Sequence, residues 1–172
     1  MSEDIDALAS QTHDVSSGRE RRAELCIRNH VIAAMGCALI PSFIIDVAVV
    51  TGIEVKMIRD LAAIYDFPVP RKLVAYKLLL SLIGSIAPLY FAAKAKSAVK
   101  GVPLFGHATY IGFLSLTNAA AVYAVGKIFQ KHYETGGNFL GSKKSTLKNY
   151  FETQYTQGKQ LAPGLRAESR LG

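Results

Sequence analysis

"LFGHATYIGFLSLTNAAAVYAVG", residues 104–126, is a run of twenty-three residues without a formal charge. As an α-helix it would be about 34 Å long, enough to cross the roughly 30 Å hydrocarbon core of a bilayer. Lys127 and Lys131 close the run, and the Gly136-Gly137 pair that follows is typical of a helix end. The pattern predicts a helix over about residues 104–135, which is the strongest membrane candidate in the chain.

Small side chains and one amide mark the face on which this helix would pack. Small residues recur four apart, as in Ser115 with Ala119 and Ala120 with Ala124, and this spacing lets two backbones approach closely. Alanine-rich soluble helices show the same spacing. An asparagine would be costly against lipid, so we expect the one in this run to hydrogen-bond a neighbouring helix. The predicted helix–helix packing residues are Gly112, Ser115, Asn118, Ala119, Ala120 and Ala124.

An earlier segment predicts a hairpin of two helices, over residues 18–40 and 42–65, with Pro41 at its tip. Proline lacks the amide donor and clashes with the preceding turn, so it interrupts the helix there. The uncharged residues 31–45 are too few for a straight span, but they would let the tip enter a bilayer. Asp46 would gain about 0.3–1 kcal/mol from the positive end of the second helix. An ordinary first-turn aspartate is the simpler interpretation.

Charged residues suggest a register for this hairpin. Folding the chain back about its proline would bring three pairs of opposite charge together: Arg28 with Glu54, Arg22 with Asp60, and Glu24 with Arg59. Each surface pair contributes only about 0–1 kcal/mol. Three matches from a single register nevertheless favour a real hairpin.

The remaining segments complete the predicted domain organisation. Residues 70–100 are expected to form a third helix, which pairs with the helix over 104–135 in a second, deeper hairpin. The helical module then covers residues 17–137. An acidic tail, residues 1–16, is expected to be disordered because it is polar and lacks periodicity. A basic tail covers residues 138–172.

The basic tail predicts one short helix, over about residues 143–156. Apolar and aromatic residues share one face of it, and lysines lie near its start; the set is Lys143, Lys144, Leu147, Lys148, Tyr150, Phe151 and Tyr155. Such a helix could lie in a membrane interface or dock a partner. It could equally pack on its own domain, and the sequence leaves both interpretations open.

The composition agrees with an all-α, membrane-associated bundle of two helical hairpins. Half of the residues are hydrophobic and the net charge is +7. The basic residues flank apolar helices and do not interleave with aromatics, so we expect a lipid bilayer as partner and no nucleic acid.

The sequence lacks the motifs that are typical of enzymes. No nucleophile elbow or Gly-rich nucleotide turn occurs, so we expect neither an enzyme nor a cofactor. Cys26 and His30 lie one helical turn apart and could supply two metal ligands. A structural zinc site needs four, so ordinary packing is favoured and no metal is expected.

"ALIPSFIIDVAVVTGIEVKMIRDLAAIYDF", residues 38–67, resembles the signature of the YcjF-like bacterial domain of unknown function. The shared elements are Pro41, Asp46, Met57-Ile58, Leu61-Ala62 and Tyr65. The stretches "GVPLFGHATYIG" and "AAAVYAVGKIFQKHYETGG" extend the likeness to about residues 25–137. The resemblance implies a helical, membrane-associated module that often follows a small GTPase domain. This sequence contains no Gly-x4-Gly-Lys-Ser/Thr phosphate loop, so a GTPase partner would act in trans.

Together these features predict a non-catalytic module embedded in the bacterial inner membrane, with its termini in the cytoplasm. It would assemble into a homo-oligomer or a larger membrane assembly, or dock a partner. Two alternatives stay open. A small oligomeric channel would place Asp46, His107 or Asn118 along a water-filled path. A soluble helical adaptor would use the apolar hairpin as its own core.

Overall fold

The structure is a computed structural model, and it describes residues 2–37, 43–75, 77–80, 82 and 106–168. The helices are α1 (Ser2–Cys37), α2 (Phe43–Ile64), α4 (Gly106–Glu134) and α5 (Lys144–Glu168), and a short 3-10 helix, η2 (Phe139–Gly141), precedes α5. The described residues contain no strand. The prediction of an all-α fold is therefore confirmed.

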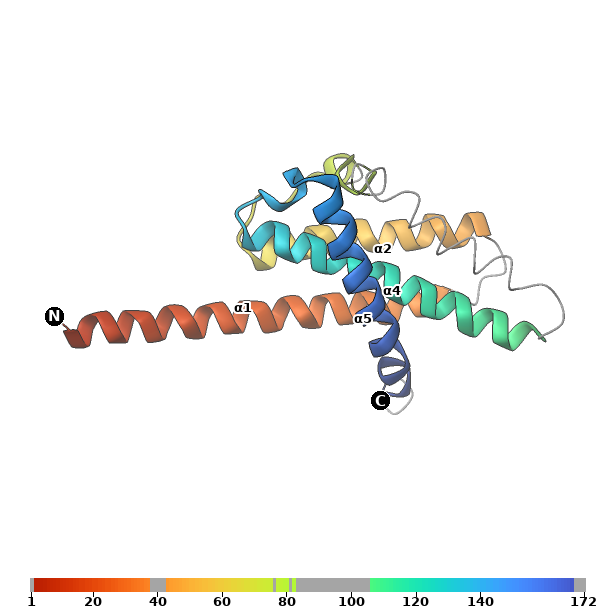
Figure 1. Cartoon of the computed structure of the whole chain (residues 1–172), viewed down its shortest axis with the longest axis horizontal. Coiled ribbons are helices and arrows are strands. Elements are labelled where there is room, and N and C mark those ends of the chain that lie inside the picture. Colours follow the sequence, from red (N-terminus) through yellow and green to blue (C-terminus); the bar gives the residue numbers. More distant parts are fainter. Residues whose placement is uncertain (1, 38–42, 76, 81, 83–105, 169–172) are drawn as a thin grey trace.

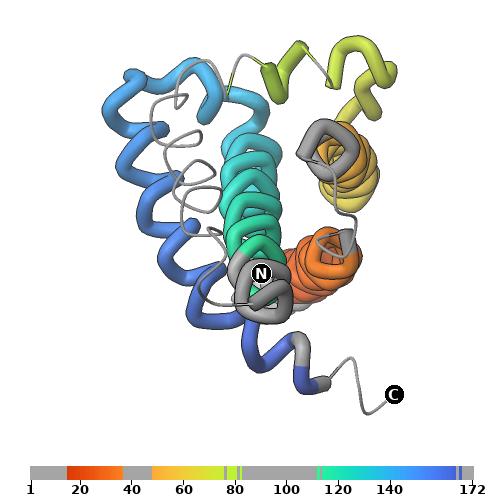
Figure 2. The backbone as a smooth tube through the Cα atoms, turned by 90° about the vertical axis from the view of Figure 1, so that its right-hand side faces the viewer, coloured from red at the N-terminus to blue at the C-terminus, as the bar shows by residue number. Residues whose placement is uncertain are grey.

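The central helix of the bundle is α4. It packs against α1 and α2 on one side and against α5 on the other (Figures 1 and 2). The helices α1 and α2 lie alongside each other, and α5 crosses α4 on the opposite side (Figures 1 and 2). Most residues of α4 between Ala119 and Phe129 are thereby buried by helices of the same chain.

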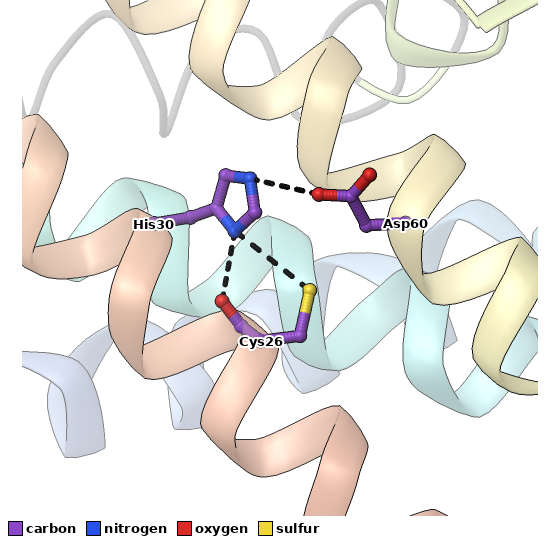
Figure 3. Close-up of side chains that lie close together, drawn as sticks. All are labelled: Cys26, His30 and Asp60. Carbon is purple, nitrogen blue, oxygen red and sulfur yellow. Dashed lines mark hydrogen bonds and ion pairs between the residues drawn. The ribbon is translucent and has the colours of Figure 1, made fainter.

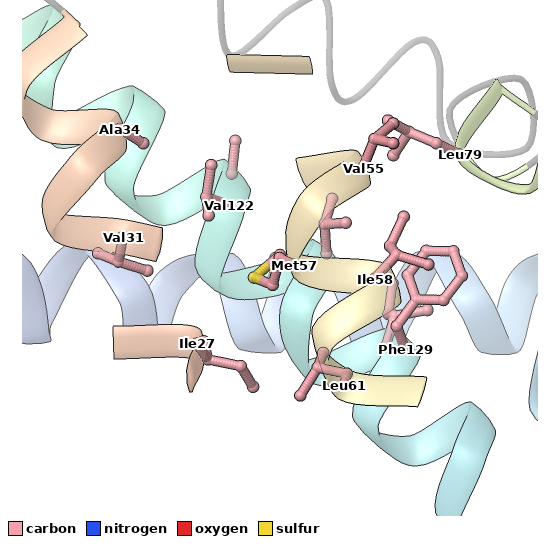
Figure 4. Close-up of a cluster of buried hydrophobic side chains, with 14 of the residues drawn as sticks. Ile27, Val31, Ala34, Val55, Met57, Ile58, Leu61, Leu79, Val122 and Phe129 are labelled. Carbon is pink, nitrogen blue, oxygen red and sulfur yellow. The ribbon is translucent and has the colours of Figure 1, made fainter. Parts of the chain in front are cut away.

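The core lies where α1, α2 and α4 meet. Ile27, Val31 and Ala34 follow helical spacing on α1 and are at most 1% exposed. Figure 4 shows their side chains together with those of α2 and α4. Gly126 permits this close approach, because a Cβ there would lie 3.0 Å from Ile27 Cγ1 and from Met57 Sδ. The three helices thus share one tightly packed apolar junction.

The predicted lipid environment of α4 is not what the structure shows. Ala119, Val122, Val125 and Phe129 are all fully buried against the other helices. Among the described residues, none of the helices combines the length and the hydropathy that a membrane crossing requires. The uncharged part of α4 has apolar residues on every face, and such a helix fits the centre of a bundle as well as it fits lipid.

The first helix begins at Ser2, although residues 1–16 were expected to be disordered. Residues 2–16 contain no glycine or proline to interrupt a helix. The acidic residues Glu3, Asp4 and Asp6 lie in the first turns, where the positive end of the helix dipole favours carboxylates. In Figure 1 the N-terminal half of α1 extends beyond the other helices.

The last helix is also longer than predicted, since it runs to Glu168 and not to about residue 156. Gly158 and Pro163 read as helix breakers in the sequence, yet both lie inside α5. Gly158 is buried against α4, and Ala162 is fully buried. Packing on α4 therefore outweighs the weak intrinsic helix propensity of this segment.

The end of α4 is as predicted. Gly136 and Gly137 have φ of 66° and 86°, a left-handed conformation that glycine adopts without strain. The amide of Gly137 donates to the carbonyl of His132 at 2.8 Å, and the amide of Gly136 donates to the carbonyl of Tyr133 at 3.1 Å. This is the glycine-rich helix end in which otherwise unpaired carbonyls are capped.

Of the predicted third helix, residues 72–75 and 77–80 are helical. Residues 76, 81 and 83–100 of the predicted range lie outside the described residues, as does Pro41 at the predicted hairpin tip. Arg59 Nε donates to the carbonyl of Pro70 at 3.1 Å and so fastens the connector after α2 to that helix.

Candidate functional site

Cys26, His30 and Asp60 form a cluster between α1 and α2 (Figure 3). Cys26 and His30 lie one turn apart on α1, and Asp60 reaches them from α2. One ligand-type atom of each residue lies within 4.8 Å of the others. His30 Nε2 is 3.4 Å from Asp60 Oδ2, and Cys26 Sγ is 3.7 Å from His30 Nδ1.

Hydrogen bonding determines which nitrogen of His30 carries a proton. His30 Nδ1 lies 2.8 Å from the carbonyl oxygen of Cys26. A carbonyl only accepts, so Nδ1–H is the donor. The Nε2 atom is thereby directed at the carboxylate of Asp60, which also accepts from Lys56 Nζ at 2.5 Å. The cluster thus combines a thiol, an imidazole and a carboxylate with one competing cation.

Burial makes the Cys26 thiol a weak acid. Desolvation and the neighbouring negative charge of Asp60 raise its pKa to about 11, although Lys56 acts in the opposite direction. At neutral pH the sulfur is therefore protonated. A cation bound at this position would favour the thiolate instead.

A second polar network joins α1, α2 and α4. Lys127 Nζ donates to Glu24 and, at 2.7 Å, to the side-chain oxygen of Gln130. Gln130 Nε2 donates to the hydroxyl of Tyr65 at 3.3 Å, and that hydroxyl donates to Glu134 at 2.9 Å. These contacts align three helices at one end of the bundle. They account for polar residues on a helix that is otherwise apolar.

The predicted small-residue face of α4 lies within the bundle. Ser115 Oγ donates to the carbonyl of Met35 on α1 at 3.2 Å. Asn118, Ala119, Ala120 and Ala124 are fully buried, and Gly112 is partly exposed with open space beside its Cα. The helices that they contact belong to the same chain.

Two residues of the predicted hairpin register, Asp60 and Glu24, have charged partners other than the predicted ones. Asp60 contacts His30 and Lys56 in place of Arg22, which is exposed. Glu24 contacts Lys127 of α4 in place of Arg59. A register counted from Pro41 assumes a tight turn and no shift of one helix along the axis of the other. The sequence contains no feature that fixes the size of this shift.

The other predicted positions are placed as follows. Glu54 is fully buried on α2, and Arg28 is partly buried on α1. Asp46 lies in the first turns of α2, and its side chain is outside the described part of the structure.

The predicted interfacial helix has its apolar face on α4. Leu147 and Phe151 are 3% and 1% exposed, and Tyr150 and Tyr155 are partly buried. Lys143, Lys144 and Lys148 are exposed. Of the two interpretations that the sequence left open, packing on its own domain is the one that the structure shows.

Residues 69–80 form a surface that sequence reasoning missed; we call it the apolar–basic segment. Val69, Leu73, Val74 and Leu80 are between 45% and 75% exposed. Arg71, Lys72 and Lys77 are exposed among them, whereas Ala75 and Leu79 are buried beneath. The seven-residue spacing of Leu73 and Leu80 was available in the sequence, but these residues were predicted only as part of a helix over residues 70–100. In Figures 1 and 2 this segment and the start of α5 lie at the same end of the bundle.

Comparison with known proteins places the chain in a family. Residues 3–160 match a family described as a domain of unknown function, DUF697. The chain belongs to this family. It is also 33% identical over 166 residues to magnetosome membrane protein 22 of Magnetospirillum gryphiswaldense, an alignment that covers 95% of this chain and 84% of that protein. No solved structure matches the chain.

Membership of the DUF697 family confirms the predicted likeness to an uncharacterised family. The YcjF-like label and the association with a GTPase stay predictions.

Proposed function

We propose that this protein is a non-catalytic helical module that associates with anionic membranes through the apolar–basic segment. The single observation that supports this most directly is the segment's surface: four exposed large apolar side chains interleaved with three exposed basic ones. Apolar side chains that enter the interface while lysines and arginines meet lipid phosphates are the usual features of an interfacial membrane contact.

Three further observations support the proposal. The 33% identical relative is called a membrane protein. The start of α5 lies at the same end of the bundle as the segment. Lys144 and Lys148 in α5 and Lys143 directly before it are exposed. The described polar clusters join helices to one another, which suits a structural role better than a catalytic one.

The proposal differs from the sequence-based expectation in where lipid contacts the chain. The expected span over residues 104–126 would put α4 in the hydrocarbon, whereas the proposal leaves α4 inside the bundle and assigns lipid contact to residues 69–80. Self-assembly and a GTPase acting in trans are further proposals that are compatible with this arrangement.

Vesicle flotation tests the proposal. The protein should float with vesicles of phosphatidylcholine and phosphatidylglycerol, float less with phosphatidylcholine alone, and be released as salt screens the charges. The double variant Leu73→Glu/Leu80→Glu should lose flotation. Leu161→Glu is the matched control, because Leu161 is 47% exposed on α5, away from the segment.

The possible results distinguish membrane association from a role as a helical adaptor. Flotation that is equal for the double variant and for the control would show that lipid contact lies elsewhere. Failure of the unaltered protein to float would favour a helical adaptor that binds proteins.

A further inference from the structure

We propose that Cys26, His30 and Asp60 form a binding site for a divalent transition-metal ion of the zinc type, which would join α1 to α2. This inference is independent of the proposed membrane association. The three side chains supply sulfur, nitrogen and oxygen, each of which zinc accepts in proteins.

The spacing of two ligand atoms fits one ion. Two nitrogen or oxygen ligands at about 2.0–2.1 Å from a tetrahedral ion lie roughly 3.4 Å apart. His30 Nε2 and Asp60 Oδ2 are separated by 3.4 Å. Both atoms point into the same space between the two helices (Figure 3).

The imidazole is already oriented as a metal ligand would be. A metal-binding histidine commonly donates its second ring N–H to a carbonyl or a carboxylate, which fixes the ring and leaves the other nitrogen for the metal. Here His30 Nδ1 donates to the carbonyl of Cys26 at 2.8 Å. The bond is local to one turn of α1, so the orientation does not depend on the ion.

The thiol selects the class of metal. A sulfur ligand favours zinc, cobalt and similar ions over magnesium and calcium, which prefer oxygen. The Cys26 thiol would lose its proton on binding, and the ion's positive charge would stabilise the resulting thiolate. One ligand-type atom of each residue lies within 4.8 Å of the others. Cys26 Sγ lies 3.7 Å from His30 Nδ1, so the Cys26 side chain would have to rotate toward the Nε2 side of the ring to complete the set.

Lys56 is the competitor for this site. Its ammonium contacts Asp60 Oδ2 at 2.5 Å and holds the position that a metal would take. The Lys56 side chain is 68% exposed, so it can move into water when an ion binds. The Asp60 side chain is 38% exposed, which leaves room for a water molecule as fourth ligand. Three protein ligands and a water are a common arrangement for zinc.

The test is a titration of the full-length protein, with any affinity tag removed, with Co²⁺ as a spectroscopic probe. A cobalt–thiolate charge-transfer band should appear and saturate at one equivalent, and Zn²⁺ should abolish it by displacement. Cys26→Ser should remove the band. Cys37→Ser is the matched control and should retain it, because Cys37 lies eleven residues further along α1 than Cys26.

Two further variants keep the test decisive if Cys26→Ser folds poorly. Asp60→Asn should raise the Kd for cobalt severalfold while the band persists. Lys56→Met should lower the Kd severalfold, because it removes the competing cation. Absence of a band in the unaltered protein, loss of the band in Cys37→Ser, or an unchanged Kd in Lys56→Met would each overturn the proposal.

Discussion

Gly158 of α5 lies directly against the backbone of Ala120 in α4: a Cβ added at Gly158 would be 2.9 Å from Ala120 Cα. Tyr123 Cβ would be equally close, at 3.0 Å. The two helices therefore cross where Gly158 of α5 meets Ala120 of α4, two residues with minimal side chains. Ala120 was predicted from the sequence to be a packing residue. The structure shows that its partner is a glycine in the same chain.

Gly158→Ala should weaken the contact between α5 and α4. The added methyl group meets the backbone Cα of Ala120 and the Cβ of Tyr123, neither of which can rotate away, and overpacking of this kind costs about 1–3 kcal/mol. The free energy of unfolding, measured by urea titration, should fall by that amount. Gly164→Ala is the matched control on the same helix, since the space beside Gly164 is open. It should leave stability unchanged or raise it by about 0.5–1 kcal/mol. Equal effects of the two substitutions would contradict this packing.

Gly137→Ala should also destabilise the protein. Its φ of 86° is unfavourable for any residue with a Cβ, and the new methyl group would lie 2.9 Å from Phe67 Cζ. The left-handed conformation alone costs about 1–2 kcal/mol. Thermal unfolding should show a lower midpoint for Gly137→Ala than for Gly141→Ala, where nothing lies within 4 Å. A midpoint for Gly137→Ala equal to that of the control would count against the structure of this turn.

Stability should decrease at alkaline pH. Burial raises the pKa of Tyr133 from 10.0 to about 12, and the Tyr133 hydroxyl donates to the carbonyl of Ile58 at 3.1 Å. The native state therefore keeps a proton that the unfolded chain loses. The resulting stabilisation is complete below pH 10 and is lost as the pH rises through about 12.

Tyr133→Phe isolates this contribution. The variant loses one hydrogen bond, which costs about 1 kcal/mol at neutral pH. It should show a smaller decrease in the urea midpoint than the unaltered protein when the pH is raised from neutral to about 11. Parallel pH profiles for the two proteins would show that Tyr133 does not titrate in this way.

The sequence was a good guide to the position of α4 but not to its surroundings. A charge-free run that ends at Lys127, followed by two glycines, predicts a helix over 104–135, and the observed bounds are Gly106–Glu134. The same residues would suit lipid or protein, because alanine and valine on every face fit both. Only the positions of α1, α2 and α5 decide between these environments, and tertiary contacts of this kind leave no local pattern.

The length of α5 could not be predicted for a related reason. Gly158 and Pro163 each lower helix propensity, so a reading based on local signals ends the helix before them. In the structure Gly158 packs closely against α4. Whether a glycine is favourable at this position of the helix therefore depends on residues far away in the sequence.

Two of the three residues in the candidate metal cluster could be predicted from the sequence. Cys26 and His30 are one turn apart and can be read from the sequence. Asp60 joins them through a hairpin register that charge matching did not give correctly. The third ligand thus depends on tertiary structure.

The most direct test of the account uses tryptophan as a reporter, because the chain contains none. Leu73→Trp, Phe129→Trp and Leu161→Trp place single tryptophans in the apolar–basic segment, at a buried position in the C-terminal part of α4 and on the exposed face of α5. With phosphatidylglycerol vesicles that contain brominated lipid, fluorescence of Leu73→Trp should be quenched and blue-shifted, while that of the other two should not change. Quenching of Phe129→Trp without quenching of Leu73→Trp would mean that lipid surrounds α4, and it would contradict both the bundle and the proposed membrane surface.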